Sequence, residues 1–232
     1  MARCTKEEAL ATRDRLLDAA ELVFSEKGVS RTSLNDIAEA AGVSRGAIYW
    51  HFKNKADLFN AMMERTTLPM EDSLQQIGQD AGQDPLAELQ HAISSAMRKI
   101  ATDERTRRVF EVATLKVEYV DELLAVKARH LQCYVNGVSQ MQRSLEEAAA
   151  RRQAPLQTPA TAAAQGLHAL MIGLIHTWLL APTSFELVVV ADKAVATYLV
   201  GLGMVPVPCG VQTGSAQQVS HVEHALGNVS QL

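Results

Sequence analysis

The sequence predicts an all-α protein made of a small N-terminal three-helix domain and a larger C-terminal helical domain. Along most of the 232 residues, apolar side chains recur at helical spacing, and no long segment alternates as a surface strand does. Polar residues that commonly cap helices precede these segments. The composition, 47% hydrophobic and 21% charged, is ordinary for a globular protein and excludes a chain that is disordered throughout.

Four helices with short connections are expected at the N-terminus. Thr5 and Glu8 have the spacing of a capping box, and the helix that they open extends to Gly28. A short second helix ends at Gly42, and the fourth covers residues 55 to about 79. The residues expected to cap the second, third and fourth helices are Ser33, Ser44 and Asn54.

Five further helices are expected after this group. Asp84 and Asp103 precede the first two, and a long helical pattern covers residues 125–152. An uncharged helix is expected over 160–181, and Ser184 is expected to cap a last helix that runs to about residue 202.

The helices and the composition together predict the domain limits. We place a small helical domain at residues 10–70 and a larger helical domain at 71–203. Residues 204–232 are rich in proline, glycine, serine and glutamine, so we expect a poorly ordered tail there.

Charge and cysteine usage narrow the class of protein. The net charge of −4 argues against a histone-like protein that coats nucleic acid. Cys4, Cys133 and Cys209 are few and widely spaced, which favours free thiols in a reducing cytoplasm. The polar N-terminus lacks the apolar stretch of a signal peptide. A membrane span within 160–181 is the alternative to a helix buried on several sides, and we favour burial because polar residues interrupt it.

Residues 31–55 carry the most informative pattern. Two predicted helices meet there at a tight turn around Gly42, which is the helix-turn-helix arrangement. Residues 41–55 include three basic side chains and no acidic one. On a helical wheel that points Ile48 inward, Tyr49 and Trp50 point outward, where large aromatic rings are costly unless a partner uses them.

This pattern favours DNA binding, against the alternative that the aromatic side chains pack on the rest of the chain. The third helix would enter the major groove, with Arg45 donating to guanine and the aromatic edges touching thymine methyl groups. Phosphates would be held by exposed backbone amides at helix N-termini and by polar side chains. The side chains assigned to phosphate are Ser33, Ser44, Tyr49, His51 and Lys55.

The segment TSLNDIAEAAGVSRGAIYWHFKNKADL resembles the DNA-binding signature of the TetR family of bacterial transcriptional regulators. The resemblance extends over roughly residues 5–182 and points to the AcrR-like branch that represses multidrug efflux pumps. It is specific in the first sixty residues, which include TKEEALATRDRLLDAAELVFSEKG, and weaker in TRRVFEVATLKVEYVDEL and GLIHTWLLAP. The resemblance implies an all-helical homodimer, in which a helix-turn-helix domain at residues 10–70 binds a double-stranded DNA operator. The domain at 71–203 is then expected to dimerise and to bind a small hydrophobic or amphipathic effector. The DNA contacts that it implies fall on Ser33, Asn35, Ser44, Arg45, Gly46, Ala47, Tyr49, Trp50, His51 and Lys55.

The C-terminal half is expected to hold the effector site. Pockets between bundle helices are mostly apolar with a few polar groups, and methionine adapts to varied shapes. Two acids in the set would suit a cationic ligand, although plain core packing is an open alternative for each residue. The candidates are Met97, Phe110, Glu111, Thr114, Glu118, Met141 and Trp178.

A dimer is expected because one recognition helix covers too few base pairs for a unique site, whereas a two-fold pair reads an inverted repeat. The interface is expected to come from the uncharged helix and the last one, and Gly166 and Gly173 of the uncharged helix permit close helix approach. The alternative is that these helices fill the core of one chain. The interface candidates are Leu167, Leu170, Leu174, Ile175, Leu187, Val188, Ala191, Val195 and Tyr198.

The sequence gives little support for catalysis, a cofactor or a metal site. The sequence shows no nucleophile–base arrangement, phosphate loop or zinc-protease motif, so we expect no enzyme and no cofactor. His221 and His224 lie in the expected tail and do not indicate a metal site. The alternatives left open are a TetR-type regulator of a metabolic or signalling operon, a helical DNA-binding protein without an effector, and a helical enzyme.

Overall fold

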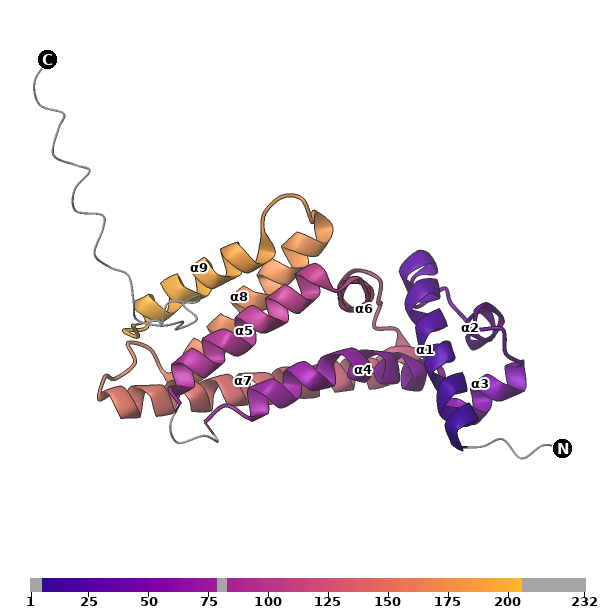
Figure 1. Cartoon of the computed structure of the whole chain (residues 1–232), viewed down its shortest axis with the longest axis horizontal. Coiled ribbons are helices and arrows are strands. Elements are labelled where there is room, and N and C mark those ends of the chain that lie inside the picture. Colours follow the sequence, from indigo (N-terminus) through magenta and orange to yellow (C-terminus); the bar gives the residue numbers. More distant parts are fainter. Residues whose placement is uncertain (1–5, 79–82, 206–232) are drawn as a thin grey trace, which may run out of the picture.

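The computed structural model describes residues 6–78 and 83–205, and every regular element in those residues is a helix. The N-terminal helices are α1 (Lys6–Lys27), α2 (Leu34–Ala40), α3 (Arg45–His51) and α4 (Lys55–Gln75). The later elements are α5 (Pro85–Thr102), α6 (Glu104–Leu115), the 3-10 helix η1 (Asp121–Leu123), α7 (Leu124–Arg152), α8 (Ala160–Leu180) and α9 (Leu187–Gly201). Figure 1 shows α1–α3 gathered at one end and α4 running beside α7 into the bundle of later helices. The all-α prediction is confirmed.

Side-chain caps start most helices where the sequence predicts them. The five cap residues each accept a hydrogen bond from a backbone N–H two or three residues ahead: Ser33, Ser44, Asn54, Asp84 and Asp103. The expected cap Ser184 is wrong, because α9 begins at Leu187 and Ser184 Oγ donates to Ala181 O at 2.6 Å in the turn after α8. Thr5, Cys4, Cys209, both tail histidines and most of the expected tail lie outside the described residues.

The core of the N-terminal end contains side chains from far along the chain. Phe24 of α1 and Phe59 of α4 are fully buried at its centre, with ring centroids 5.9 Å apart. Four fully buried apolar residues from the C-terminal part complete the same cluster: Val109, Val112, Leu123 and Val126. The boundary expected near residue 70 stays a prediction, but apolar packing is continuous across it.

Helix α4 joins the two ends of the molecule. It ends at Gln75, a few residues before the expected end. Pro69 lies inside it and removes one backbone donor from the helix, while Ser73 Oγ donates to Pro69 O at 2.8 Å. The N-terminal half of α4 is buried among α1–α3, and its C-terminal half packs on α7 and the bundle.

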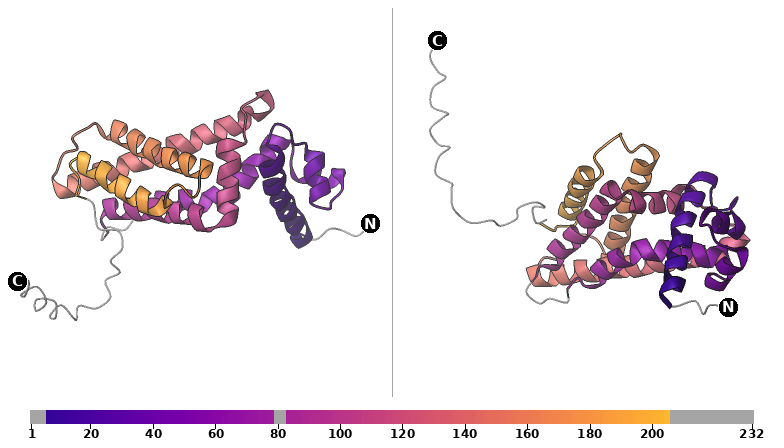
Figure 2. Two further views of the ribbon diagram at one scale, coloured as in Figure 1. Left: turned by 90° about the horizontal axis from the view of Figure 1, so that it is seen from above. Right: turned by 45° about the vertical axis from the view of Figure 1, so that its right-hand side comes forward.

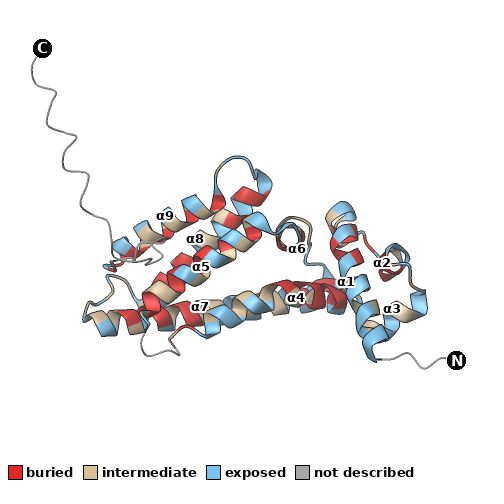
Figure 3. Cartoon of the chain, viewed as in Figure 1, coloured by how far each residue is buried: buried red, intermediate tan, exposed pale blue. Residues whose placement is uncertain are grey.

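Helix α8 packs one side against α7 and α9 and leaves its other side uncovered (Figures 2 and 3). Among the described helices it alone has the length and apolar composition of a membrane span, and 33% of its apolar window is buried. The expectation that it is buried on several sides is wrong for the single chain, since Ile172 and Leu180 are 47% and 62% exposed.

Candidate nucleic-acid interface and effector cavity

Two short capped helices build the helix-turn-helix. Ser33 Oγ accepts from the backbone N–H of Asp36 at 3.1 Å, and the Asp36 carboxylate accepts from Ser33 N–H at 2.8 Å. The Ser33 hydroxyl also donates to the Asp36 carboxylate at 2.5 Å, and this bond, together with the one from Ser33 N–H, holds the pKa of Asp36 well below its usual value. Gly42 takes a φ of +65° in the turn, and Ser44 Oγ accepts from Ala47 N–H at 3.2 Å to start α3.

Helix α3 turns one aromatic face to solvent. Ile48 is fully buried, whereas Tyr49 is 50% exposed and Trp50 is 73% exposed. The outward orientation that the helical wheel predicts is therefore present. The Arg45 guanidinium lies 5.8 Å from the Tyr49 ring centroid, within cation–π range, so Arg45 and the aromatic face are held together.

The remaining residues of the implied DNA contact set lie around this face. Five of them are exposed or half-buried on α2, α3 and the turn: Asn35, Ser44, Gly46, Ala47 and His51. Burial lowers the pKa of His51, and the nearby Arg13 guanidinium lowers it further. His51 is therefore an uncharged donor near neutral pH. Arg13, from α1, stacks over Phe52 at 5.3 Å, and no local pattern in the sequence indicates that it lies beside α3.

A hollow of about 460 Å³ lies beside α3 and brings together three of the residues assigned to phosphate, Ser33, Tyr49 and Lys55. Two further basic residues, Arg31 and Lys53, border it. Sequence reasoning missed Arg31, although its place next to the second helix was a usable signal.

Lys55 does not extend freely into solvent. Its side chain is 10% exposed, and Nζ donates to Ser30 O at 3.1 Å and pairs with Glu122 Oε1 at 2.6 Å. Glu122 belongs to η1, far along the chain, and it is the acidic residue among those that border the hollow. No local sequence pattern connects these two residues.

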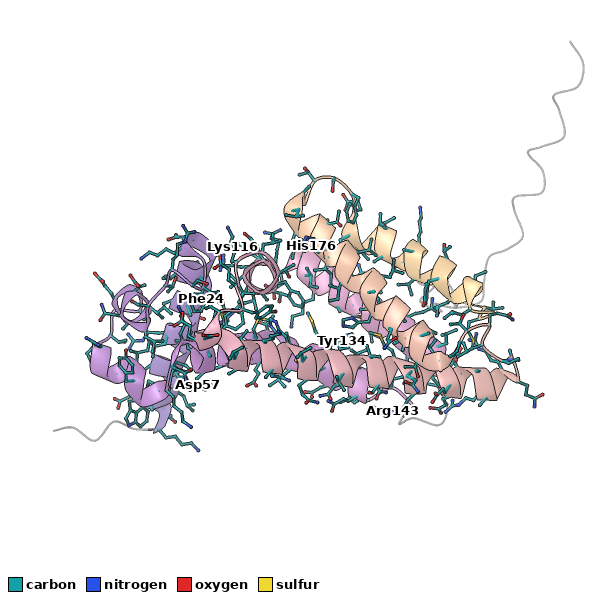
Figure 4. All side chains as sticks on the ribbon, turned by 180° about the vertical axis from the view of Figure 1, so that it is seen from behind. Phe24, Asp57, Lys116, Tyr134, Arg143 and His176 are labelled. Atoms are coloured by element: carbon teal, nitrogen blue, oxygen red, sulfur yellow. The ribbon has the colours of Figure 1, made fainter. Side chains whose placement is uncertain are left out.

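Ion pairs and hydrogen bonds fasten the N-terminal end to the bundle. Glu21 of α1 is 3% exposed, and its Oε1 accepts from Arg65 of α4 at 2.5 Å and from Arg105 of α6 at 3.0 Å. Val29 N–H donates to the backbone carbonyl oxygen of Lys116 at 3.0 Å, and Figure 4 labels Lys116 at the end of α6. These contacts connect α1 and the turn after it to both α4 and α6.

A small cavity of about 140 Å³ lies between α4, α7 and α8. Glu71 of α4 lines it, accepting from Arg129 at 3.3 Å and from the Cys133 thiol at 3.6 Å. Burial raises the pKa of the Cys133 thiol, and burial lowers the pKa of His168, so both are neutral near pH 7. The other lining residues are Leu74, Gln75, Asn136, Gly137, Gln140, Met141, Met171 and Ile172.

Of the seven effector candidates, Met141 lines this cavity and six do not. Met97 and Trp178 are buried in the core of the bundle, and Phe110 packs against that core. These three positions agree with the alternative that the candidates are ordinary core residues. Glu111 and Thr114 are half-buried on α6, and Glu118 is exposed after it. The sequence missed the remaining lining residues because several faces of α7 are apolar and only tertiary packing selects one.

The nine residues expected to form the dimer interface face the core of the single chain. Five of them are buried in the bundle core: Leu167, Ile175, Leu187, Ala191 and Val195. The other four are half-buried and pack against that core: Leu170, Leu174, Val188 and Tyr198. The apolar side chains that α8 and α9 expose are different ones, and they include Ile172, Leu180, Val189 and Val200.

Comparison with known proteins identifies the family to which this chain is similar. Residues 16–62 match the family described as bacterial regulatory proteins of the tetR family, and residues 84–204 match the C-terminal region of MAATS-type transcriptional repressors. The chain belongs to the TetR family. The resemblance read from residues 32–58 is thereby confirmed.

Relatives within the TetR family match nearly end to end. The regulator TtgR of Pseudomonas putida is 37% identical over 207 residues, which cover 89% of this chain and 98% of TtgR. Among solved structures, NalD, the secondary repressor of the MexAB-OprM multidrug efflux pump in Pseudomonas aeruginosa, is 34% identical, with a TM-score of 0.77 over 84% of this chain and 98% of NalD. SmeT of Stenotrophomonas maltophilia in complex with triclosan is 30% identical, with a TM-score of 0.74 over 87% of this chain and all of that one (100%). These relatives are transcriptional regulators.

Proposed function

We propose that this TetR-family regulator is a repressor that binds an inverted-repeat operator as a homodimer in the cytoplasm. A small hydrophobic or amphipathic effector releases it, and the regulated genes form a multidrug efflux operon. The observation that carries the proposal is the solvent-facing Tyr49–Trp50 side of α3, mounted on a capped helix-turn-helix. The end-to-end match to NalD, a repressor of an efflux pump, supports the choice of operon.

The DNA contacts follow from the positions of the side chains. Helix α3 enters the major groove, where Arg45 reads guanine and the Tyr49 and Trp50 rings meet thymine methyl groups. The bordering groups of the hollow, including Ser33 and Lys55, hold the phosphate backbone and fix the register.

Operator binding is tested with a fluorescein-labelled fragment of the DNA upstream of the chain's own gene. Anisotropy titration at fixed salt measures the dissociation constant of the wild type, Tyr49→Ala and Trp50→Ala. Loss of these contacts is expected to weaken specific binding at least about tenfold. Tyr134→Ala, the same substitution at an aromatic residue that is 37% exposed on α7, is the matched control and is expected to bind as wild type. Specific binding that survives both α3 substitutions overturns the DNA-binding assignment.

The effector is proposed to bind the cavity between α4, α7 and α8. Its lining is largely apolar, and the Glu71 carboxylate is already paired with Arg129, which favours an uncharged aromatic ligand with a hydrogen-bonding group. Triclosan, the ligand in the similar SmeT complex, has this chemistry and is the first probe.

Gly137 offers a way to block this cavity from within α7. A Cβ at Gly137 meets no atom within 4 Å, so the leucine of Gly137→Leu has open cavity space to occupy. We expect Gly137→Leu to keep operator affinity and to lose release by triclosan in the anisotropy assay. Ala128→Leu, on an exposed position of α7, is the control that should respond as wild type. Unchanged release from Gly137→Leu contradicts the assignment of this cavity.

The dimer is proposed to form through the uncovered sides of α8 and α9. Leu180 and Val200 are 62% and 60% exposed there, and a Cβ at Gly173 meets nothing within 4 Å, so another helix can approach closely. We expect Leu180→Glu to yield monomers in sedimentation velocity and to lose operator affinity. Val135→Glu, at an equally apolar exposed position on α7, should remain dimeric, and a dimeric Leu180→Glu protein would locate the interface elsewhere.

A further inference from the structure

The pairing of Lys55 with Glu122 joins the DNA-binding end to the bundle at the place where phosphate is expected. Lys55 begins α4 and borders the hollow together with Ser33 and Tyr49. Glu122 reaches the same hollow from η1, which directly precedes α7. The Nζ–Oε1 separation is 2.6 Å, and the Glu122 side chain is 55% exposed, so the carboxylate faces the solvent from which DNA arrives.

The hydrogen-bonding capacity of Lys55 sets up a competition. An ammonium group has three N–H donors and no acceptor. One contacts Ser30 O at 3.1 Å and another meets Glu122, which leaves a single donor for a third partner. A DNA phosphate that takes Lys55 must approach the Glu122 carboxylate or displace it, and like charges at such short range repel.

We propose that Glu122 is a positioning residue that competes with the DNA backbone for Lys55 and thereby lowers operator affinity. This inference rests on the proposed function, since it assumes that the hollow receives phosphate. It adds a contact from the bundle to a site built otherwise from α2, α3 and α4.

The location of Glu122 connects this competition to the bundle. Leu123 and Val126, on either side of the η1–α7 junction, are fully buried in the N-terminal core, so the segment is anchored beside Lys55. Cys133 and Met141 of the same helix line the effector cavity, beginning about 14 Å along the axis from Leu124 at the usual rise per residue. Because α7 runs unbroken from η1 to the cavity, a rotation or shift of α7 that carries its N-terminal end changes the separation of Glu122 from Lys55.

The test is operator affinity as a function of salt for Glu122→Gln, which keeps the shape of the side chain and removes its charge. We expect the variant to bind the labelled upstream DNA about threefold to tenfold more tightly than wild type at moderate salt. The slope of log affinity against log salt should steepen by about one per protomer, because a displaced Glu122 carboxylate takes up a cation that the variant does not need.

Asp121→Asn is the matched control, because it removes the same charge one residue away without touching the Lys55 pair. We expect a smaller change in affinity from Asp121→Asn and an unchanged slope. In a Lys55→Met background, Glu122→Gln should give no gain. Thermal melting of each variant checks that the fold is retained.

Three results would overturn the inference. They are a Glu122→Gln protein with wild-type affinity and slope, one with weaker binding, and a gain that Asp121→Asn matches or that persists without Lys55. A wild-type protein that fails to bind the upstream DNA would instead overturn the proposed function, so the two failures are distinguishable.

Discussion

Gly166 is the position at which one added methyl group is expected to be most disruptive to the packing of α8 on α9. A Cβ there would lie 2.2 Å from Tyr198 Oη and 3.0 Å from Tyr198 Cζ. The ring has little freedom to withdraw, because its hydroxyl donates to Ala163 O at 2.9 Å across the two helices. Gly166→Ala therefore forces Tyr198 to give up this hydrogen bond and to repack.

The expected cost follows from three contributions. Losing the hydrogen bond costs about 1 kcal/mol. Overpacking of the contact between the helices costs about 1–3 kcal/mol. The higher helix propensity of alanine relative to glycine stabilises the folded state by about 1 kcal/mol. The free energy of unfolding of Gly166→Ala should thus fall by about 1–3 kcal/mol relative to the wild type.

Urea denaturation followed by circular dichroism, at one fixed protein concentration, measures this difference. Gly137→Ala is the control within another helix, because its Cβ meets no atom within 4 Å, and it should be as stable as wild type or more so. In a Tyr198→Phe background, where the nearest clashing atom is absent, the penalty of Gly166→Ala should shrink. A Gly166→Ala protein as stable as Gly137→Ala, or a penalty that Tyr198→Phe leaves unchanged, would refute the reasoning.

Three further predictions concern charge and pH. Glu21→Gln should lower the free energy of unfolding, measured in urea, by about 1–3 kcal/mol. Asp18→Asn, at an exposed partner of the same arginines, Arg65 and Arg105, should lower it by less than about 1 kcal/mol. Equal effects of the two substitutions would contradict this prediction. Burial lowers the pKa of His130, so the unfolded chain binds the extra proton and stability should fall as the pH drops below about 6.5. His130→Gln should flatten that part of a stability–pH curve, and an unchanged curve would exclude His130 as the source. The lowered pKa of Asp36 stabilises the fold above its unfolded pKa of about 4, and this contribution is lost as the pH falls further; Asp36→Asn should abolish this component of acid unfolding, and a variant that retains it would be inconsistent with the capping geometry.

Local signals explain why much of the N-terminal end could be predicted from sequence. The caps at Ser33, Ser44 and Asn54 act through backbone groups only three residues away, so the pattern that suggests them nearly specifies their geometry. The outward face of α3 follows from helical periodicity once Ile48 is taken as buried.

Contacts between distant segments could not be predicted in the same way. Lys55 and Glu122 are an ordinary pair of charged residues until folding brings η1 beside the start of α4. The dimer interface stays a prediction, because α8 is apolar on more than one side and composition does not say which side meets α9 in the same chain. The cavity residues of α7 were missed for a similar reason, since Met141 alone among the candidates lies on the face that meets α4 and α8.

The four valine and leucine side chains that α6, η1 and α7 insert among α1–α4 bear on how regulators of this kind can be recombined. A hybrid that exchanges only about the first seventy residues between two relatives would combine the DNA-binding helices of one protein with core side chains of the other. Val109, Val112, Leu123 and Val126 would then meet partners shaped for other side chains. A chimera that recognises a new operator therefore has to take the residues at these four positions from the same relative as the DNA-binding helices.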